Sequence, residues 1–263
     1  MSQNYYYLVT GLPDLVTGGV KGFDYAKIRQ EIIEELTSED IVLLKLFLLQ
    51  FDNVNIINIL NKQQGFDSRG WYSKIDLEDA MSDVETLPQY LQTFLQDRKE
   101  DKESVAGIGV FEQLSYLYYQ EVSAKNQWFA DWADFCLDVQ NVIAAANARK
   151  LGVSTDKSIV LLNDNAEKIA KSRALDFGLG GSLPWIEQIT KNLADPIALE
   201  EAIDEIYWKR ADELSEGKTF GIESVLGFMV KANSIERWLR LNTDNGIARA
   251  NDLIEKLKSQ VQK

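Results

Sequence analysis

The segment WFADWADFCLDVQNVIAAANARKLG, residues 128–152, decides the fold class. Its apolar residues recur in alternating steps of four and three, at Trp128, Trp132, Phe135, Val139, Val142 and Ala146. Because one helical turn holds about 3.6 residues, this spacing places them on one face of an amphipathic helix that packs against a core. An aromatic stripe of this kind is more typical of packing than of a cofactor site. Cys136 lies within the pattern, and we interpret it as a small core residue rather than a nucleophile.

Helical patterns continue over most of the 263 residues, and only 4 prolines and 16 glycines interrupt them. Strand patterns are nearly absent, so the predicted class is all-α. Start signals for helices are predicted at Asp24, at the Thr37–Asp40 pair, near Pro88, and at Asp195 with Pro196 in the first helical position. Loops are predicted at 65–70 and 178–184, and the charged run 97–103 is interpreted as a solvated linker or helix end.

Composition excludes several classes of function. The net charge of −13 speaks against nucleic acid as a partner, because phosphate binding needs concentrated Lys and Arg. The chain has one cysteine and no histidine, which removes disulfides, Ser-His-Asp triads and His-based metal sites. We therefore expect a protein that is not an enzyme and has no catalytic, cofactor-binding or metal-binding residues.

An enzyme is the alternative in which clustered carboxylates do the chemistry. The candidate clusters are Glu34, Glu35, Glu39 and Asp40, and the stripe Asp131, Asp134 and Asp138. Helical bundles that bind two metal ions through carboxylates usually also need Glu-x-x-His pairs, which a chain without histidine cannot supply.

The first residues, MSQNYYYLVTGLPDL, fit neither a signal peptide nor a membrane anchor. Residues 1–4 contain no Lys or Arg, and the apolar run 5–9 is far shorter than the about 20 residues of a membrane span. The longest apolar run, 41–51, is interrupted by Lys45 and Gln50. We expect a cytoplasmic protein in which residues 5–9 form a short helical segment docked on the rest and ended at Pro13. Tyr5, Tyr6 and Tyr7 then serve either core packing or contact with a partner.

A short polar motif recurs inside long apolar helices. Its first copy is DNVNIINILN at 52–61, and its second is DVQNVIAAAN at 138–147. Both have Asp, then Asn three residues later, and Asn at the tenth position, and a weaker third copy begins at Asn233. The motif residues are Asp52, Asn55 and Asn61 in the first copy, Asp138, Asn141 and Asn147 in the second, and Asn233, Glu236 and Asn242 in the third.

Two interpretations of the motif remain open. Asp and Asn are poor residues for a helix interior, and a spacing of three places both on one face. They either form a solvated polar stripe opposite the core, or receive hydrogen bonds from a neighbouring loop or helix end. The recurrence itself favours three related helical modules, at about 1–100, 101–190 and 191–263.

The motif resembles the repeats of a central-stalk component of archaeal and vacuolar-type rotary ATPases, the C subunit, whose eukaryotic counterpart is the d subunit. In that family an acidic residue, two residues and Asn-Ile precede a basic helix end, and LDVQNVIAAANARKLG and FDNVNIINILNKQ look like this pattern. The tail from Gly221 is similar to the final segment of the same family. The opening YYYLVTGLPDL and the overall layout resemble a bacterial family, domain of unknown function 2764, which is encoded beside V-type ATPase subunits.

The resemblance implies an elongated or funnel-like array of about three related small bundles. It also implies a non-catalytic central-stalk adaptor that couples the rotor shaft to the proteolipid ring. Its partners would be other V-type ATPase subunits, and its place the inner face of the plasma membrane, peripherally bound and without a transmembrane segment. The alternative is a free-standing helical scaffold for an unrelated partner.

Overall fold

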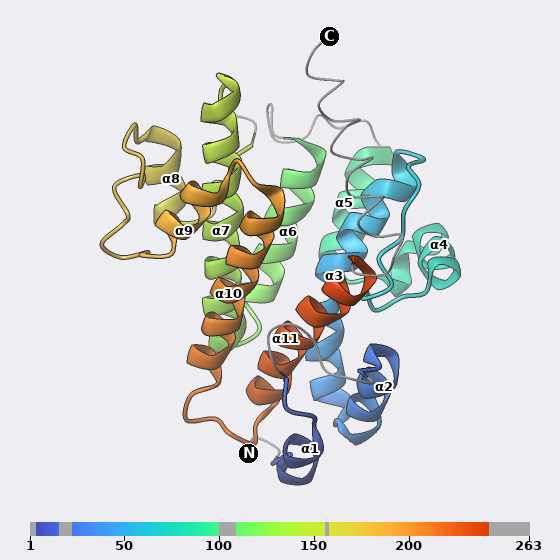
Figure 1. Ribbon diagram of the computed structural model, residues 1–263. Coiled ribbons are helices and arrows are strands. Elements are labelled where there is room, and N and C mark those ends of the chain that lie inside the picture. The colour runs from blue at the N-terminus through green and yellow to red at the C-terminus, as the bar shows by residue number, and fades with distance from the viewer. Residues whose placement is uncertain (1–3, 16–22, 100–108, 156–157, 242–263) are drawn as a thin grey trace. The chain divides into compact units, whose positions relative to one another are not determined.

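The structure is a computed structural model that describes residues 4–15, 23–99, 109–155 and 158–241 (Figure 1). These residues contain helices and no strand, which confirms the predicted all-α class. The helices are α1 (Tyr6–Gly11), α2 (Tyr25–Glu35), α3 (Ser38–Leu60), α4 (Lys74–Ser82), the 3-10 helix η1 (Val84–Thr86), α5 (Gln89–Lys99), α6 (Val110–Ser123), α7 (Gln127–Leu151), α8 (Asp164–Lys171), α9 (Ile186–Asn192), α10 (Pro196–Ser215) and α11 (Ile222–Leu241). Among the described helices, none combines the length and the apolar character needed to cross a bilayer.

The chain divides into two compact units. The larger spans 42–206, and the smaller joins 1–41 to 207–263. The boundaries fall inside α3 and α10, so the first and last parts of the chain belong to one unit. The predicted division into three modules differs from this division into two units. The three modules and their arrangement as an array stay a prediction.

In the larger unit α7 packs against α6, α8 and α9, and aromatic rings link it to α3. The ring of Phe47 on α3 lies 6.2 Å from that of Trp128 and 6.0 Å from that of Trp132, both on α7. The hydroxyl of Tyr118 on α6 donates to the carbonyl of Leu46 at 3.0 Å. All six residues of the predicted aromatic and apolar stripe are buried, as is Cys136, which confirms their predicted place in the core.

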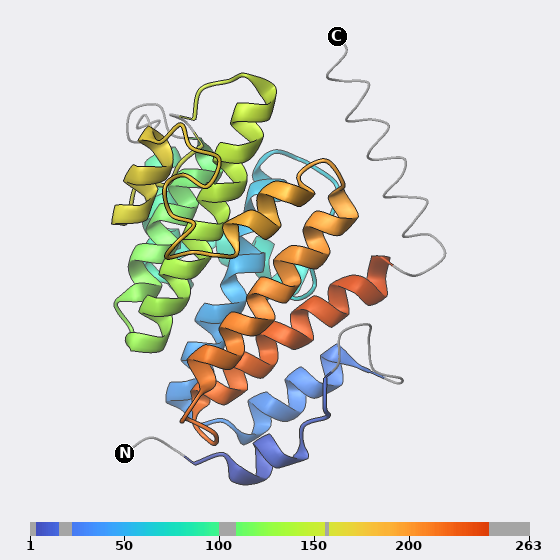
Figure 2. The same cartoon turned by 60° about the vertical axis from the view of Figure 1, so that its left-hand side comes forward.

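The smaller unit contains α1, α2, the end of α10 and α11 (Figure 2). Helix α2 contacts α11, and the end of α10 approaches α11 closely at Gly227, where a Cβ atom would lie 2.4 Å from the hydroxyl of Ser215. Lys231 on α11 forms an ion pair with Asp212 and lies 5.5 Å from the centre of the Trp208 ring.

The four predicted helix starts are observed, at α2, α3, α5 and α10. The side chain of Asp24 accepts from the N–H of Lys27 at 3.0 Å, and that of Asp195 accepts from the N–H of Ile197 at 2.9 Å. Helix α5 begins directly after Pro88. Helix α9 was not predicted: it has seven residues, and only Ile186 and Ile189 are buried, too few for a visible period.

Candidate functional site

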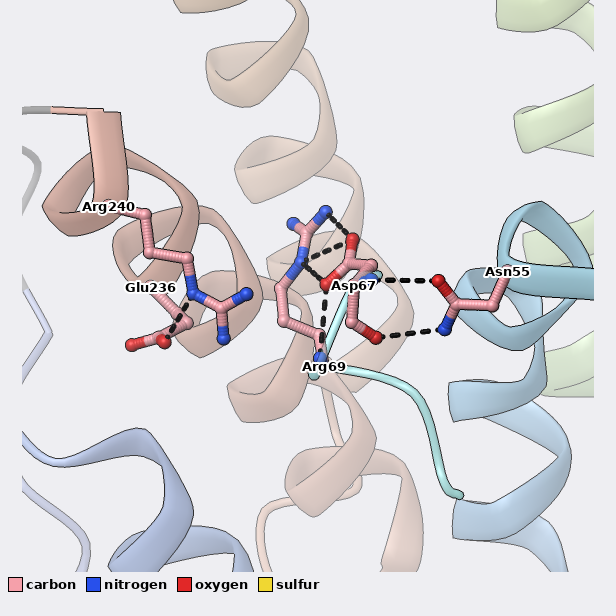
Figure 3. A network of polar contacts seen from close by, with 5 residues as sticks. All are labelled: Asn55, Asp67, Arg69, Glu236 and Arg240. Carbon is pink, nitrogen blue, oxygen red and sulfur yellow. Dashed lines mark hydrogen bonds and ion pairs between the residues drawn. The ribbon is translucent and has the colours of Figure 1, made fainter. Parts of the chain in front are cut away.

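The first motif copy holds a loop against α3. The side-chain amide of Asn55 donates to the carbonyl of Asp67 at 2.9 Å, and its oxygen accepts from the N–H of the same residue at 2.7 Å (Figure 3). The carboxylate of Asp67 in turn binds Arg69, whose guanidinium stacks on the ring of Phe51 at 4.3 Å. The side-chain amide of Asn presents an N–H donor and a carbonyl acceptor side by side, so it can pair with both the carbonyl and the N–H of one residue.

Asp52, one turn earlier on α3, anchors the end of the same loop. Its carboxylate accepts from the N–H of Trp71 at 2.6 Å. Gly70 lies directly against this carboxylate, and a Cβ atom there would fall 2.2 Å from Asp52 Oδ1. A side chain at position 70 would therefore require the carboxylate of Asp52 to move. We call Asp52, Asn55, Asp67, Gly70 and Trp71 the α3 clamp.

The second motif copy repeats this arrangement on α7. The amide of Asn141 donates to the carbonyl of Val160 at 3.0 Å, and its oxygen accepts from the N–H of Val160 at 2.9 Å. Both residues are almost completely buried, with exposures of 0% and 1%. The sequence separation of the pair has grown from 12 residues in the α3 clamp to 19.

Asp138 accepts hydrogen bonds from side chains, whereas Asp52 in the α3 clamp accepts one from a backbone N–H. Its two oxygens accept from the amides of Asn163 at 3.1 Å and Asn165 at 2.8 Å. Asn163 also caps α8, because its own oxygen accepts from the N–H of Ala166 at 2.9 Å. We call Asp138, Asn141, Val160, Asn163 and Asn165 the α7 clamp.

The carboxyl group of Asp138 is held mainly by neutral donors. Burial raises its pKa, and the hydrogen bonds from Asn165 and Asn163 oppose this rise. Nearby Asp134 raises the pKa further and Lys168 lowers it. With 5% and 0% exposure, Asp138 and Asn141 do not belong to a solvated stripe, so for them that interpretation is wrong and the loop-binding interpretation describes their contacts.

The remaining motif residues lie outside the two clamps. The tenth residues, Asn61 and Asn147, are exposed. On α11, Asn233 is buried, and Glu236 accepts from Nε of Arg240 at 2.8 Å (Figure 3). Asn242 and residues 100–103 of the charged run predicted at 97–103 lie outside the described residues.

The tyrosine segment forms the predicted short helix, α1, which ends before Pro13. Tyr5 is buried, and its hydroxyl accepts from the N–H of Thr37 at 3.2 Å and donates to Asp40. In a capping box, a Glu three residues after the cap accepts from the N–H of the cap residue. Asp40 is one methylene shorter than Glu, and here the hydroxyl of Tyr5 bridges Asp40 to that N–H. Burial and Asp40 both raise the pKa of Tyr5.

Several residues that organise the clamps were not singled out in the sequence. Arg149, at the basic end of the second motif copy, donates to the carbonyls of Ser172 and Ala174 at 2.6 Å and stacks on Phe177 at 4.0 Å. Asn53 accepts from the hydroxyl of Tyr90 at 2.7 Å. Two features of the sequence could have identified them. Arg149 is a basic residue in the last turn of a helix, and Asn53 is an Asn next to the motif in an apolar run.

The arrangement is suited to holding loops, and its polar groups face other parts of the same chain. Asn55 and Asn141 are completely buried, so a partner would have to displace the clamped loop to reach them. Two carboxylates of the suggested catalytic clusters are also engaged internally, Asp40 by Tyr5 and Thr37 and Asp138 by two asparagines.

One protein family matches this chain over nearly all of its length. Its description reads "Protein of unknown function (DUF2764)", and the match covers residues 1–261. No curated protein and no solved structure matches.

Proposed function

The chain belongs to the DUF2764 family, and from that premise we propose that it is a non-catalytic subunit of a V/A-type rotary ATPase. In this role it is a central-stalk adaptor similar to the C (or d) subunit, which couples the rotor shaft to the proteolipid ring of the membrane. It needs no cofactor, and it lies peripherally on the inner face of the plasma membrane when assembled.

The observation that carries this proposal is the equivalence of the two clamps. The motif copies through which the chain resembles the ATPase adaptor lie on α3, with 23 residues, and on α7, with 25. In both, the Asn binds the two backbone groups of one loop residue, and the Asp binds a donor further along the same segment. A shared sequence motif that performs the same task twice supports an internal duplication, as expected for a chain built from repeated modules like that adaptor.

The clamps also suit a part that transmits torque. A rotating adaptor must resist deformation, so its loops should move with the helices that carry them. Buried hydrogen bonds inside a packed core give such stiffness, because breaking one leaves polar groups unsatisfied at a cost of about 1–3 kcal/mol each. This task requires shape and rigidity rather than acid–base chemistry.

A tagged copy of the chain, purified from its native host, tests the proposal. We expect the shaft and ring subunits of the ATPase to co-purify with it. A matched control is an unrelated helical protein with the same tag and a similar net charge, which should recover neither. An intact ATPase that never contains this chain would contradict the proposal.

A free-standing scaffold is the second candidate, since the clamps would stiffen any helical framework. The genes that neighbour this one on the chromosome distinguish the adaptor from the scaffold. Neighbouring genes for ATPase catalytic and ring subunits favour the adaptor, and isolation from such genes favours the scaffold.

A further inference from the structure

The three consecutive tyrosines have different surroundings. Tyr5 is buried and fixed through Thr37 and Asp40 to residues 34–40, where α2 ends and α3 begins and which we call the α2–α3 turn. Tyr6 is 50% exposed and Tyr7 88% exposed. The segment thus uses one tyrosine to attach the helix and presents the other two to solvent.

The two exposed rings adjoin each other, and that of Tyr6 also adjoins the half-buried ring of Phe220. The ring of Tyr6 lies 5.5 Å from that of Tyr7 and 4.9 Å from that of Phe220. The backbone N–H of Tyr5 donates to the carbonyl of Phe220 at 2.7 Å, which ties α1 to the segment before α11. We call Tyr6, Tyr7 and Phe220 the aromatic patch. Single exposed apolar residues are normal, but adjoining tyrosines on an anchored element are typical of the residues that dominate protein–protein binding.

The patch loses little freedom on binding. Tyr offers a large contact area with only two side-chain torsions, and the contacts of Tyr5 already fix the position of the helix. Pre-organisation of this kind reduces the entropic cost of association.

The carboxylates of the α2–α3 turn favour a positively charged partner. Tyr5 contacts Asp40 in the first turn of α3. Along the chain, the exposed residues Glu34 and Glu35 at the end of α2 and Glu39 at the start of α3 lie within six positions of Asp40. Residues 30–44 contain no Lys or Arg, so nothing within this stretch neutralises its carboxylates. Arg and Lys side chains can stack on tyrosine rings and also pair with carboxylates, with Arg the better suited to both.

We propose that the aromatic patch is a docking surface for an Arg- or Lys-bearing segment of another protein. This rests on the proposed function, under which that segment belongs to a shaft or ring subunit of the ATPase. The tyrosine rings supply contact area and the carboxylates of the α2–α3 turn supply the charge that orients the segment.

Two variants test the docking surface in the co-purification experiment. Tyr7→Ala removes the most exposed ring, and Tyr7→Lys adds a charge that repels a basic segment. We expect recovery of the ATPase subunits to fall at least tenfold with the first and further with the second. Leu175→Ala is the matched control, because Leu175 is 87% exposed in the larger unit and should leave recovery unchanged. Thermal unfolding of each variant should match that of the wild type.

A direct binding measurement separates this inference from the ATPase proposal. The probe is a 16-residue alanine-based peptide with arginine at every fourth position, titrated by calorimetry at physiological salt. We expect the wild-type chain to bind it at least fivefold more tightly than Tyr7→Ala, and Leu175→Ala to match the wild type. A peptide with glutamate in place of arginine should not bind.

The outcomes are distinct. If the wild-type chain recovers no ATPase component but binds the arginine peptide through Tyr7, the adaptor proposal fails and the docking surface stands. If the ATPase is recovered equally by wild type, Tyr7→Ala and Tyr7→Lys, the adaptor proposal stands and the docking surface is overturned. Equal affinity of wild type and Tyr7→Ala for the peptide also overturns it.

Discussion

The α3 clamp and the α7 clamp make the same pairing to loop residues that differ in burial. Each uses an Asn to pair with both backbone groups of one loop residue. In the α3 clamp that residue is the partly exposed Asp67, and in the α7 clamp it is the buried Val160. The motif is therefore common to both pairings, and we expect the burial of the loop residue to determine how much stability depends on each.

The largest effect is expected for Asn141→Ala. This change leaves the buried N–H and carbonyl of Val160 without their partner, and each unsatisfied group costs about 1–3 kcal/mol. We expect the free energy of unfolding, measured by urea denaturation, to fall by about 2–4 kcal/mol. Asn147→Ala, at the exposed tenth position of the same copy, should change it by less than about 0.5 kcal/mol.

The same change in the α3 clamp should cost less. In Asn55→Ala, water can reach the backbone of Asp67, so we expect a loss of about 1–2 kcal/mol. Asn61→Ala serves as the matched control. Equal losses for Asn55→Ala and Asn141→Ala would show that burial does not set the difference between the clamps.

Gly70→Ala probes the close approach of Gly70 to Asp52, a contact that belongs to the α3 clamp alone among the two. The new Cβ would collide with the carboxylate of Asp52, and overpacking of this kind costs about 1–3 kcal/mol. In an Asp52→Ala background the collision is gone, so the cost of Gly70→Ala should fall by at least half. A double-mutant cycle measures this coupling, and additive effects would contradict the proposed contact.

Arg149→Gln probes the arginine in the last turn of α7, which bonds two carbonyls of the segment after α8. In the gapless alignment of the two motif copies, the residue that corresponds to Arg149 is the exposed Gln63. The change removes two hydrogen bonds to the carbonyls of Ser172 and Ala174 and the stacking on Phe177. We expect a loss of about 1–2 kcal/mol in urea denaturation, because one of these bonds is exposed. Arg149→Lys should restore little of it, since Lys lacks the planar group that bonds both carbonyls while stacking.

The sequence predicted the helical half of each clamp better than the loop half. Asp52, Asn55, Asp138 and Asn141 stood out because polar residues repeated at one spacing inside apolar helices. Their partners could not be predicted, because Asp67 and Val160 contribute backbone groups, which every residue type possesses. The residues that carry these partners lie 12 and 19 positions away, and no local pattern fixes that distance.

The tyrosine segment shows a similar limit. Its helix and its end at Pro13 were predicted from local signals. The hydroxyl of Tyr5 bridges two groups that are more than 30 residues away in the sequence, Thr37 and Asp40. The unusual Asp in place of Glu at the capping position was visible, but nothing local identified the side chain that compensates for its shorter length.

Asp138→Asn should have the smallest effect at neutral pH and a distinctive dependence on pH. The new amide keeps one acceptor for Asn163, whose orientation is fixed by its bond to the N–H of Ala166. Its N–H₂ group then faces Asn165, which can rotate its amide by half a turn and accept instead. We therefore expect a loss at pH 7 of under about 1 kcal/mol, the net value of one hydrogen bond.

The pH dependence follows from the raised pKa of Asp138. Because its pKa is higher in the folded chain than the ordinary value of 3.8, the folded state binds more protons than the unfolded state in that range. The contribution of Asp138 to stability is therefore greatest below the ordinary pKa, falls as the pH rises through the folded pKa, and is level above it. Urea denaturation of wild type and Asp138→Asn from about pH 4 to 8 should show the wild type losing its advantage as the pH rises. A difference that stays constant would mean that the asparagines only offset the cost of burial, and one that grows with pH would mean that they stabilise the carboxylate more than burial destabilises it.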